Sequence, residues 1–363
     1  MTETPVTIAG PVFLVDDERI GDLARDCIGL QISEDVSGLR TCEGRFLAVG
    51  AGATGPPAGE LLHLDGDTID LGGHLKIALG PTSTQRYVFD GYVSSIELVL
   101  DDGTPPAVVV LAEDLLMRLR MTRRSRTWIN VTDAEIATAI AAEHGLQADV
   151  DAEGPRYDVV QQLNQSDLAF LRDRGRLLQA EIWCTRRTVH FRTRPARQAT
   201  EVTLTRGRDL LSVRCAADLA DQRNEVVVTG YDAQRKGGID ERVGADVVEA
   251  EVSGGRCGAR LVAQALGPSV SFRVRENALN AEEARAWAGA EMLRRGRRFV
   301  IATGHTTGTP DLVVGSKLTL EQVGAPFEGP GYYVTRVRHT FDLRQGFRTQ
   351  FSAERASLNE VRR

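Results

Sequence analysis

Apolar and polar residues alternate over short stretches in the first hundred or so positions, and this period of two predicts β-strands. The predicted strands are Pro11–Val15, Gly44–Val49, Thr68–Leu71, His74–Leu79, Tyr87–Leu100 and Ala107–Leu111. Turn clusters rich in Gly, Pro and Asp separate them, at Gly50–Gly59, Gly72–Gly73, Gly80–Pro81 and Asp101–Pro106. Arg19–Leu30 is compatible with a short helix. Many short strands with such turns are typical of a barrel or a sandwich.

Residues 115–195 mix helical and strand patterns, which predicts an α/β block. Thr132 and Glu135 match a capping box that opens a helix, and Gly145 can end that helix. The following segment, Asp149–Pro155, is rich in Asp, Glu and Gly and is predicted to be a linker.

The most informative stretch of this block begins at Ser166, which can cap a helix, and Asp167 suits the positive helix end. Leu168, Leu171 and Leu178 form one predicted helix face. Gly175 continues this stripe and is more easily explained by close packing than by helix propensity. Two predicted strands follow, Glu181–Cys184 and Thr188–Arg192. The pattern thus predicts an amphipathic helix docked on a β-hairpin.

Strand patterns return after residue 195. The predicted strands are Glu201–Leu204, Leu210–Ala216, Asn224–Tyr231, Phe299–Thr303, Lys317–Leu320, Tyr332–Phe341 and Phe347–Phe351. A helix lies between the third and fourth of them: Asn280 and Glu283 predict its start, and Gly296 can end it.

The two β regions share a weak internal similarity. The apolar spacing from Tyr92 to Asp101 is repeated from Tyr333 to Asp342, and each copy follows a Phe-acidic-Gly triplet. Two unrelated hairpins at barrel edges would explain the match. The alternative is a duplicated barrel, with the α/β block inserted between the copies.

Composition restricts the class of protein. The 363 residues are 42% hydrophobic and 26% charged, which is typical of a globular chain of two or three domains. The longest apolar run, Ala107–Ala112, is far shorter than the roughly 20 residues of a membrane span. The first ten residues lack a basic and an apolar region, so we expect no secretory signal and synthesis in the cytoplasm. The five cysteines are scattered and fit small buried side chains better than disulfides or a zinc site.

The search for chemistry identifies no catalytic, cofactor-binding or metal-binding residue. Gly50–Gly55 satisfies the GxGxxG pattern, but the prolines after it cannot open a phosphate-binding helix. The six histidines show no metal-ligand spacing, and His339, on a predicted strand, is interpreted as structural. The basic runs Arg118–Arg126 and Arg294–Arg298 are better explained by solvated faces or ion pairs between subunits than by nucleic-acid binding, because the net charge is −6.

A resemblance to a known family adds to this picture. The helix and hairpin resemble the late control D proteins of contractile phages, which are baseplate hub proteins related to the N-terminal hub portion of type VI secretion spike proteins. The residues that carry the match are Gln162, Ser166, Asp167, Phe170, Leu171, Arg172, Trp183, His190 and Phe191. Further similarity covers residues 115–146 and the last two predicted strands, 333–342 and 346–351.

The resemblance implies an α+β, mainly β fold with two tube-like antiparallel β-barrels and an inserted α/β block. The expected segments are a first barrel (1–114), the inserted domain (115–195), a second barrel (196–235 and 297–355), an insertion with one helix (236–296) and a C-terminal tail (356–363). It also implies a homotrimer that joins a hexameric inner tube to a trimeric spike, with the spike and other baseplate proteins as partners. No membrane segment, specific nucleic-acid binding or catalysis is expected.

Two other classes of function remain as alternatives. One alternative is a tail-associated peptidoglycan hydrolase, although such activity usually lies in an appended domain. The other is a carbohydrate- or surface-binding β protein, which would need exposed aromatic side chains, but only 6% of residues are aromatic. The sequence does not distinguish a phage tail from a tailocin or another injection system.

Overall fold

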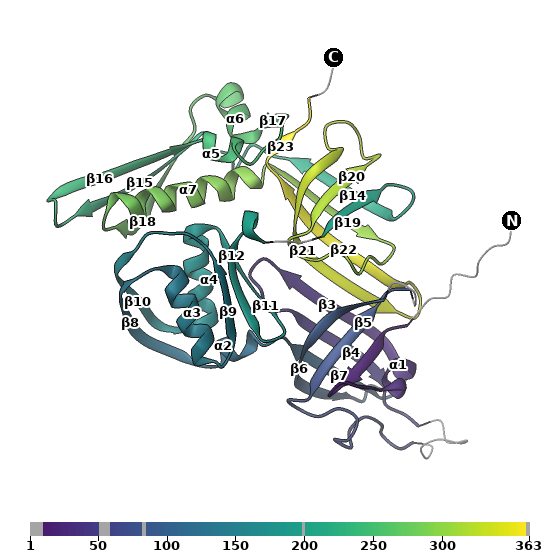
Figure 1. Ribbon diagram of the computed structural model, residues 1–363. Helices are drawn as coiled ribbons and strands as arrows, with labels where there is room; N and C mark the ends of the chain where they lie inside the picture. The colour runs from purple at the N-terminus through teal and green to yellow at the C-terminus, as the bar shows by residue number, and fades with distance from the viewer. Residues whose placement is uncertain (1–9, 51–58, 82–84, 198–199, 361–363) are drawn as a thin grey trace.

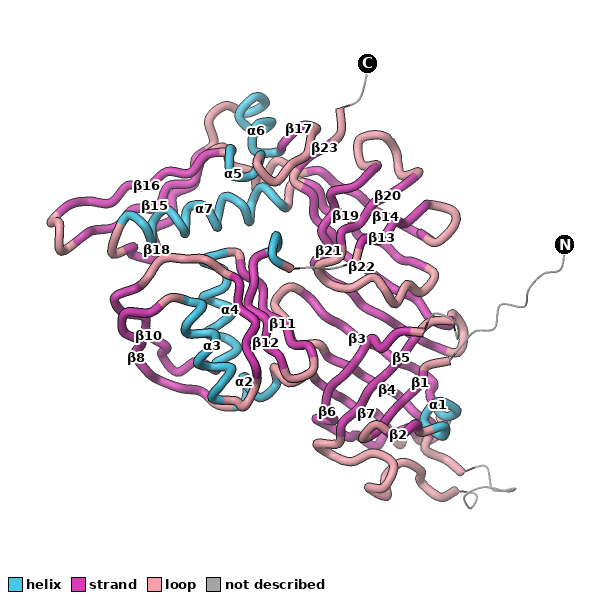
Figure 2. The backbone as a smooth tube through the Cα atoms, viewed as in Figure 1, coloured by secondary structure: helices cyan, strands magenta, loops and turns pink. Residues whose placement is uncertain are grey.

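The computed structural model describes residues 10–50, 59–81, 85–197 and 200–360. The fold is α+β and mainly β, as the sequence predicts (Figure 1). One large sheet, with the short helix α1 beside it, occupies one side of the molecule, and the other helices and the smaller sheets lie on the other side (Figure 2). The predicted GxGxxG loop falls mostly outside the described residues, as do the last three residues of the predicted tail.

Thirteen strands form the large sheet. Seven come from the N-terminal part, here called the first unit: β1 (Val12–Val15), β2 (Glu18–Arg19), β3 (Cys27–Asp35), β4 (Thr41–Leu47), β5 (His74–Leu79), β6 (Arg86–Val99) and β7 (Ala107–Glu113). Six come from the C-terminal part, the second unit: β13 (Glu201–Thr205), β14 (Leu210–Ala217), β19 (Val300–Thr306), β20 (Lys317–Glu321), β21 (Gly329–Asp342) and β22 (Gly346–Arg355).

The two units have the same strand order. The first runs β3-β4-β7-β6-β5 and the second runs β14-β19-β22-β21-β20, with antiparallel neighbours throughout. The next strand outward differs, because β1 pairs antiparallel with β5 whereas β13 pairs parallel with β20. Each unit encloses its own apolar core.

Irregularities in the two units also coincide. The pairing of β6 with β7 shifts register between Val93 and Ser95, and the pairing of β21 with β22 shifts between Val334 and Arg336. These positions match one another in the internal similarity of the sequence. Because a β-bulge is a specific local feature, its repetition favours duplication over two unrelated hairpins.

A second bulge repeats in the same way. The β3–β4 pairing shifts between Cys27 and Gly29, and the β14–β19 pairing shifts between Leu210 and Ser212. When β3 is matched with β14 and β4 with β19, both register shifts fall at the same position in the strand pairing. The two matched bulges therefore involve four strands of each unit.

Two insertions form the other side of the molecule. The first contains α2 (Met117–Met121), β8 (Arg123–Val131), α3 (Asp133–Glu143), β9 (Gln147–Asp151), β10 (Tyr157–Ser166), α4 (Asp167–Leu178), β11 (Ala180–Thr185), β12 (Thr188–Thr193) and the 3-10 turn η1 (Arg194–Ala196). The second contains β15 (Glu225–Asp232), β16 (Gly237–Gly244), α5 (Asp246–Glu249), β17 (Arg256–Cys257), α6 (Gly258–Leu266), β18 (Val270–Ala278) and α7 (Ala281–Arg297).

The two insertions share one apolar core. Ile136, Leu171 and Phe191 of the first insertion belong to the same buried cluster as Val226 and Trp287 of the second. Helix α7 lies between the β15–β16–β18 sheet and the first insertion (Figure 1). Neither insertion therefore buries its apolar face alone.

The local signals for helix starts are confirmed. Thr132 and Glu135 form both hydrogen bonds of a capping box at α3. Ser166 accepts a hydrogen bond from the backbone of Ala169 at α4, and Asn280 caps α7. Side-chain oxygens at these positions satisfy N–H groups that the helix leaves unpaired.

The short helix that the pattern allows within Arg19–Leu30 is confirmed. Helix α1 covers Gly21–Asp26, and the chain then enters β3. Leu23, Cys27 and Leu30 are all buried.

The predicted strand Thr68–Leu71 is also absent from the described residues. Asp65 instead accepts hydrogen bonds from the backbone of Asp67 and Thr68 and holds a turn. The predicted linker Asp149–Pro155 begins as strand β9, whose Asp149 pairs with His190.

Three boundaries near the C-terminus change. Gly296 does not end α7, which continues to Arg297; a Cβ at Gly296 would lie 2.5 Å from the side chain of Val248, so the glycine permits close packing. Residues 225–235, predicted to belong to the second barrel, lie in or next to the β16-β15-β18 sheet. The predicted tail forms a short strand, β23 (Ser357–Leu358), which pairs with β17.

Candidate functional site

Gln162, Ser166 and Asp167, three of the residues that carry the sequence resemblance, lie together at the start of α4. The Asp167 carboxylate is completely buried, and its oxygens lie 2.8 Å from Gln162 Nε2, 3.0 Å from an Arg126 nitrogen and 2.8 Å from His144 Nε2. A buried carboxylate requires such partners, because desolvation disfavours its charge. The cluster fixes α4 against strands β8 and β10, so these residues have a structural role.

Apolar packing holds the other face of α4. Leu168 and Leu171 are buried as predicted, but Leu178 is only partly buried and Leu177 enters the core. Gly175 is a close-packing site, as predicted: an added Cβ would lie 2.7 Å from the carbonyl oxygen of Ala180. The predicted docking of the helix on the hairpin is thus confirmed.

Trp183 lies on the opposite face of that hairpin. Its ring stacks on His190 with centroids 4.7 Å apart, and the Arg197 guanidinium lies 4.0 Å from its centroid. Strand alternation explains this placement, since Ile182 and Cys184 point into the core shared with α4. Trp183 therefore belongs to the side that meets the large sheet.

Arg172 connects α4 to the first unit. Its Nε donates to the carbonyl oxygen of Ser37 at 2.7 Å, and a terminal nitrogen donates to that of Gly38 at 3.2 Å. Both acceptors lie in the turn between β3 and β4. Arg172 is therefore a contact between the insertion and the β unit.

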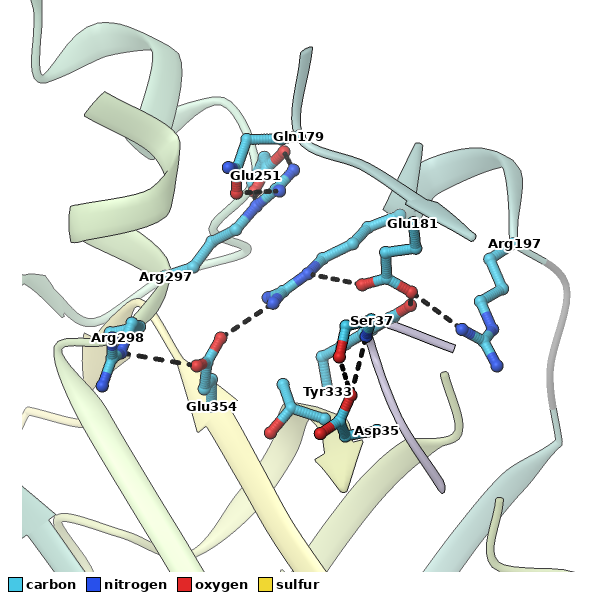
Figure 3. A network of polar contacts seen from close by, with 12 residues as sticks. Asp35, Ser37, Gln179, Glu181, Arg197, Glu251, Arg297, Arg298, Tyr333 and Glu354 are labelled. Carbon is cyan, nitrogen blue, oxygen red and sulfur yellow. Dashed lines mark hydrogen bonds and ion pairs between the residues drawn. The ribbon is translucent and has the colours of Figure 1, made fainter. Parts of the chain in front are cut away.

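A buried ionic junction lies where the first insertion and both units meet (Figure 3). Glu181 of β11 is its centre: one carboxylate oxygen lies 3.2 Å from Arg194 Nε, and the other lies 3.0 Å from Arg197 and accepts from the Tyr333 hydroxyl at 2.6 Å. The arginines belong to η1 and the residue after it, and Tyr333 belongs to β21.

The junction extends into both units. Arg197 also pairs with Glu34 of β3 at 3.2 Å, and Glu34 pairs with Arg40. Arg194 pairs with Glu354 of β22 at 2.8 Å. These residues lie far apart in the chain, so no sequence pattern groups them. The alternation of arginine with small residues around Pro195 is the local signal that could have suggested a buried turn.

Burial shapes the electrostatics of the junction. Burial alone would lower the pKa of Arg194, but Glu354 and Glu181 raise it overall. Burial, reinforced by the charge of Glu181, raises the pKa of Tyr333. The tyrosine hydroxyl therefore stays protonated and donates to Glu181. Paired buried charges of this kind contribute chiefly to a specific arrangement of the parts that they join.

Two further buried groups lie near this junction. Burial raises the pKa of Asp114 to about 7, although its bonds to Arg40 act against the shift. Burial and the charge of Arg40 lower the pKa of His339 to about 3, and its Nδ1 lies 2.9 Å from Thr349 Oγ1. His339 is thus a neutral, satisfied histidine, as predicted.

The basic runs form ion pairs within the chain. Arg120 contacts Glu113, and Arg126 contacts Glu143 and Asp167. In the second run Arg295 contacts Glu291. The arginines named here therefore pair with carboxylates of the same chain.

Among the described residues, no group of three or more His, Cys, Asp or Glu side chains is placed to hold a metal ion. A cavity of about 730 Å³ lies beside the junction, lined in part by Arg194, Tyr333, Glu354 and Arg355. Arg194 and Glu354 pair with each other, and Arg355 donates to three backbone carbonyls, so these side chains are used structurally.

Comparison with a protein family decides the classification. The family described as the Alg8 N-terminal domain matches residues 60–342, which is most of the chain. The chain belongs to this family. The matched region includes both insertions and most of the large sheet. No curated protein sequence is significantly similar to the chain.

Solved structures of similar fold are tail proteins. The 43 kDa tail protein of prophage MuSo2 from Shewanella oneidensis has a TM-score of 0.67 and 13% identity, covering 96% of this chain and 98% of that one. The tail protein from Neisseria meningitidis MC58 has a TM-score of 0.63 and 11% identity, covering 96% and 97%.

A type VI secretion component also matches. The E. coli c3393 protein, described as similar to the bacteriophage T4 tail proteins gp27 and gp5, has a TM-score of 0.54 and 14% identity, covering 90% of this chain and 73% of that one. At such identities the likeness shows a shared fold. The resemblance to phage baseplate hub proteins is confirmed at this level.

Within the described residues, no helix combines the length and apolarity of a membrane span.

Proposed function

We propose that this chain is a structural hub protein of a contractile phage tail or a related injection system, in which three copies join a hexameric inner tube to a trimeric spike. The duplicated β unit carries this proposal. Because each chain holds two similar units, a ring of three chains would present six of them and match a sixfold tube. The fold shared with phage tail proteins and with a type VI secretion component supports it.

We further propose a division of the chain that follows the sheets. The first tube-like unit covers residues 1–114, the first insertion 115–195, and the second tube-like unit 196–224 and 297–355. The second insertion then covers 225–296, with its start moved to include β15, and the tail covers 356–363.

We propose that the role is structural and not enzymatic, with synthesis in the cytoplasm followed by incorporation into the particle. Zymography on cell walls with the purified chain should show no clearing, with or without EDTA. Clearing that is lost on changing one Asp or Glu to Ala would support the peptidoglycan hydrolase instead.

The oligomeric state tests the main proposal. Mass photometry should show three copies per complex, for the chain alone or mixed with tube and spike proteins from the same genome. A chain that remains monomeric in every mixture would contradict the adaptor role.

A further inference from the structure

Within the described residues, one strand pairing joins the two β units of the chain. The C-terminal half of β21 pairs antiparallel with β3, from Arg336 opposite Asp35 to Asp342 opposite Gly29. The N-terminal half of the same β21 edge pairs with β20. The N-terminal half of this strand edge therefore pairs with a strand of its own unit, and the C-terminal half pairs with a strand of the other unit.

Because the two units are similar, each also has a strand edge equivalent to the one that the other unit uses in this junction. In the first unit β6 corresponds to β21, and its N-terminal half pairs with β5. In the second unit β14 corresponds to β3. Within the described residues, Ser95–Val99 of β6 pair only with β7, and Ser212–Ala217 of β14 pair only with β19. Both edges therefore present backbone groups that can receive another strand.

We propose that these two edges pair with each other between copies of the chain: β6 of one copy with β14 of the next, antiparallel, in the register that β21 and β3 have within the chain. The inference rests on the proposed multi-copy ring and specifies how its subunits join. Such a contact is heterologous, and it closes into a ring if the rotation at each step permits.

The register follows from the two matched bulges. Leu98 of the first unit corresponds to His339 of the second, and Cys215 of the second corresponds to Ile32 of the first. The strand pairings of the two units match residue by residue along these strands. His339 lies opposite Ile32 within the chain. Leu98 should therefore lie opposite Cys215 of the next copy, and one step along, Leu100 should lie near Val213.

Burial agrees with this register. His339, Ile32 and Phe341 are buried at the junction within the chain. The counterparts of His339 and Phe341 at the open edge are exposed, Leu98 by 38% and Leu100 by 62%, and Cys215, the counterpart of Ile32, is half-buried. Strand pairing between copies would cover these apolar side chains in the way that the internal junction covers theirs.

Charge on the opposite face agrees as well. Glu97 should lie opposite Ala216 of the next copy and diagonal to Arg214. Neither Glu97 nor Arg214 forms an ion pair within the described chain. Opposite charges on neighbouring strands stabilise a pairing modestly, and neither Pro nor Lys occurs in Leu210–Ala217 to discourage strand addition.

Disulfide trapping tests the register. The Leu98→Cys variant should form a disulfide with the native Cys215 of the next copy under mild oxidation, since directly opposite residues have Cα atoms about 4.5–5.5 Å apart. Non-reducing electrophoresis should then show covalent trimers. A second pair, Glu97→Cys with Ala216→Cys, uses two exposed positions and keeps the test valid if Leu98→Cys folds poorly.

Matched controls separate the register from chance contact. Leu98→Cys combined with Cys215→Ser should not cross-link, and Glu97→Cys alone should not bond to Cys215, because it points to the other face of the sheet. Reversing one charge, Glu97→Arg or Arg214→Glu, should weaken assembly by up to about fivefold, and the combined reversal should restore it.

The outcomes distinguish this inference from the proposed function. Cross-linked trimers at both pairs support the strand pairing. Trimers by mass photometry without a cross-link at either pair would overturn the pairing and leave the adaptor role intact. Cross-linking of the Glu97→Cys variant to Cys215 would overturn the register. A chain that is monomeric even with tube and spike proteins would overturn both.

Discussion

Arg172 Nε lies 2.7 Å from the carbonyl oxygen of Ser37, so helix α4 of the first insertion is tied directly to a turn of the first β unit. The next residue of that turn, Gly38, has a φ of 69°, and an added Cβ would lie 2.2 Å from the carbonyl oxygen of Ile182. The turn is therefore enclosed between the helix and the hairpin, which makes the relative position of insertion and unit rigid.

Arg172→Ala should destabilise the protein more than an ordinary surface substitution. It removes a charged donor from two backbone carbonyls in a partly buried contact, for which about 1–3 kcal/mol is expected. Arg176→Ala is the control, since Arg176 is exposed and pairs only with Asp173 among the described residues; it should change stability by less than about 0.5 kcal/mol. Equal, small effects in urea unfolding would show that the contact contributes nothing.

Leu171→Ala tests the apolar face of α4. Leu171 is completely buried in the core that joins both insertions, and truncation of such a leucine typically costs about 2–5 kcal/mol. The melting temperature should fall clearly, whereas Leu163→Ala, at an exposed position, should leave it nearly unchanged. A thermally silent Leu171→Ala would mean that the helix is not packed as described.

Two helical glycines should respond in opposite directions to alanine. Gly175→Ala places a Cβ 2.7 Å from the Ala180 carbonyl oxygen and should destabilise the protein, because backbone must move. Gly289→Ala, inside α7, meets no atom within 4 Å and should stabilise it by about 0.5–1 kcal/mol. Thermal melts of both variants check the pair. The same sign for both would contradict the packing at Gly175.

Local signals account for the features that the sequence predicted well. The caps at Thr132, Ser166 and Asn280 act within one helical turn, so their residues identify the helix starts directly. The close packing of Gly175 was also readable, since glycine weakens a helix and is favoured on an apolar stripe where backbone approaches closely. The similarity between Tyr92 and Tyr333 predicted the duplication that the strand order supports.

Long-range pairing accounts for the features that the sequence did not reveal. Strand β8 was interpreted as part of a basic run, because the carboxylate partners of Arg124 and Arg126 lie elsewhere in the chain. The ionic junction has the same character: Glu34 and Glu181 meet only through the folded sheet. No local pattern distinguishes such buried charges from solvated ones.

Two buried titratable groups should give opposite pH dependences of stability. The pKa of His339 is about 3 in the folded chain against an ordinary 6.5, so its contribution is present above about 6.5 and is lost as pH falls through about 3. The pKa of Asp114 is about 7 against an ordinary 3.8, so its contribution is present below about 3.8 and is lost as pH rises through about 7.

Between about pH 4 and 6.5 the contributions of His339 and Asp114 to stability change in opposite directions with pH. Single variants measure each contribution separately. The stability lost in His339→Gln should grow as pH rises through this window, and that lost in Asp114→Asn should shrink. The slopes should reach at most about 1.4 kcal/mol per pH unit. Urea unfolding at several pH values measures them, and a pH-independent difference for either variant would mean that the group titrates normally.

Glu181→Ala should be among the most damaging single changes. It leaves Arg194 and Arg197 without their shared carboxylate and Tyr333 without its acceptor, all in a buried position. Removing one member of a buried ion pair typically costs about 3–5 kcal/mol. Glu181→Gln should cost less, because the amide oxygen can still accept the Tyr333 hydroxyl. Chemical unfolding of both variants gives the comparison.

A double-mutant cycle shows whether the junction acts as a connected network. Glu181 and Arg197 are in direct contact, so the effects of Glu181→Ala and Arg197→Ala should not add, with a coupling of about 0.5–3 kcal/mol. The exposed pair of Arg242 and Asp240 is the control and should couple by less than about 1 kcal/mol. Equal coupling in both cycles would show that the buried charges contribute no more than surface ones. The β21–β3 pairing, the Arg172 contact and apolar packing would then hold the two units and the insertion together.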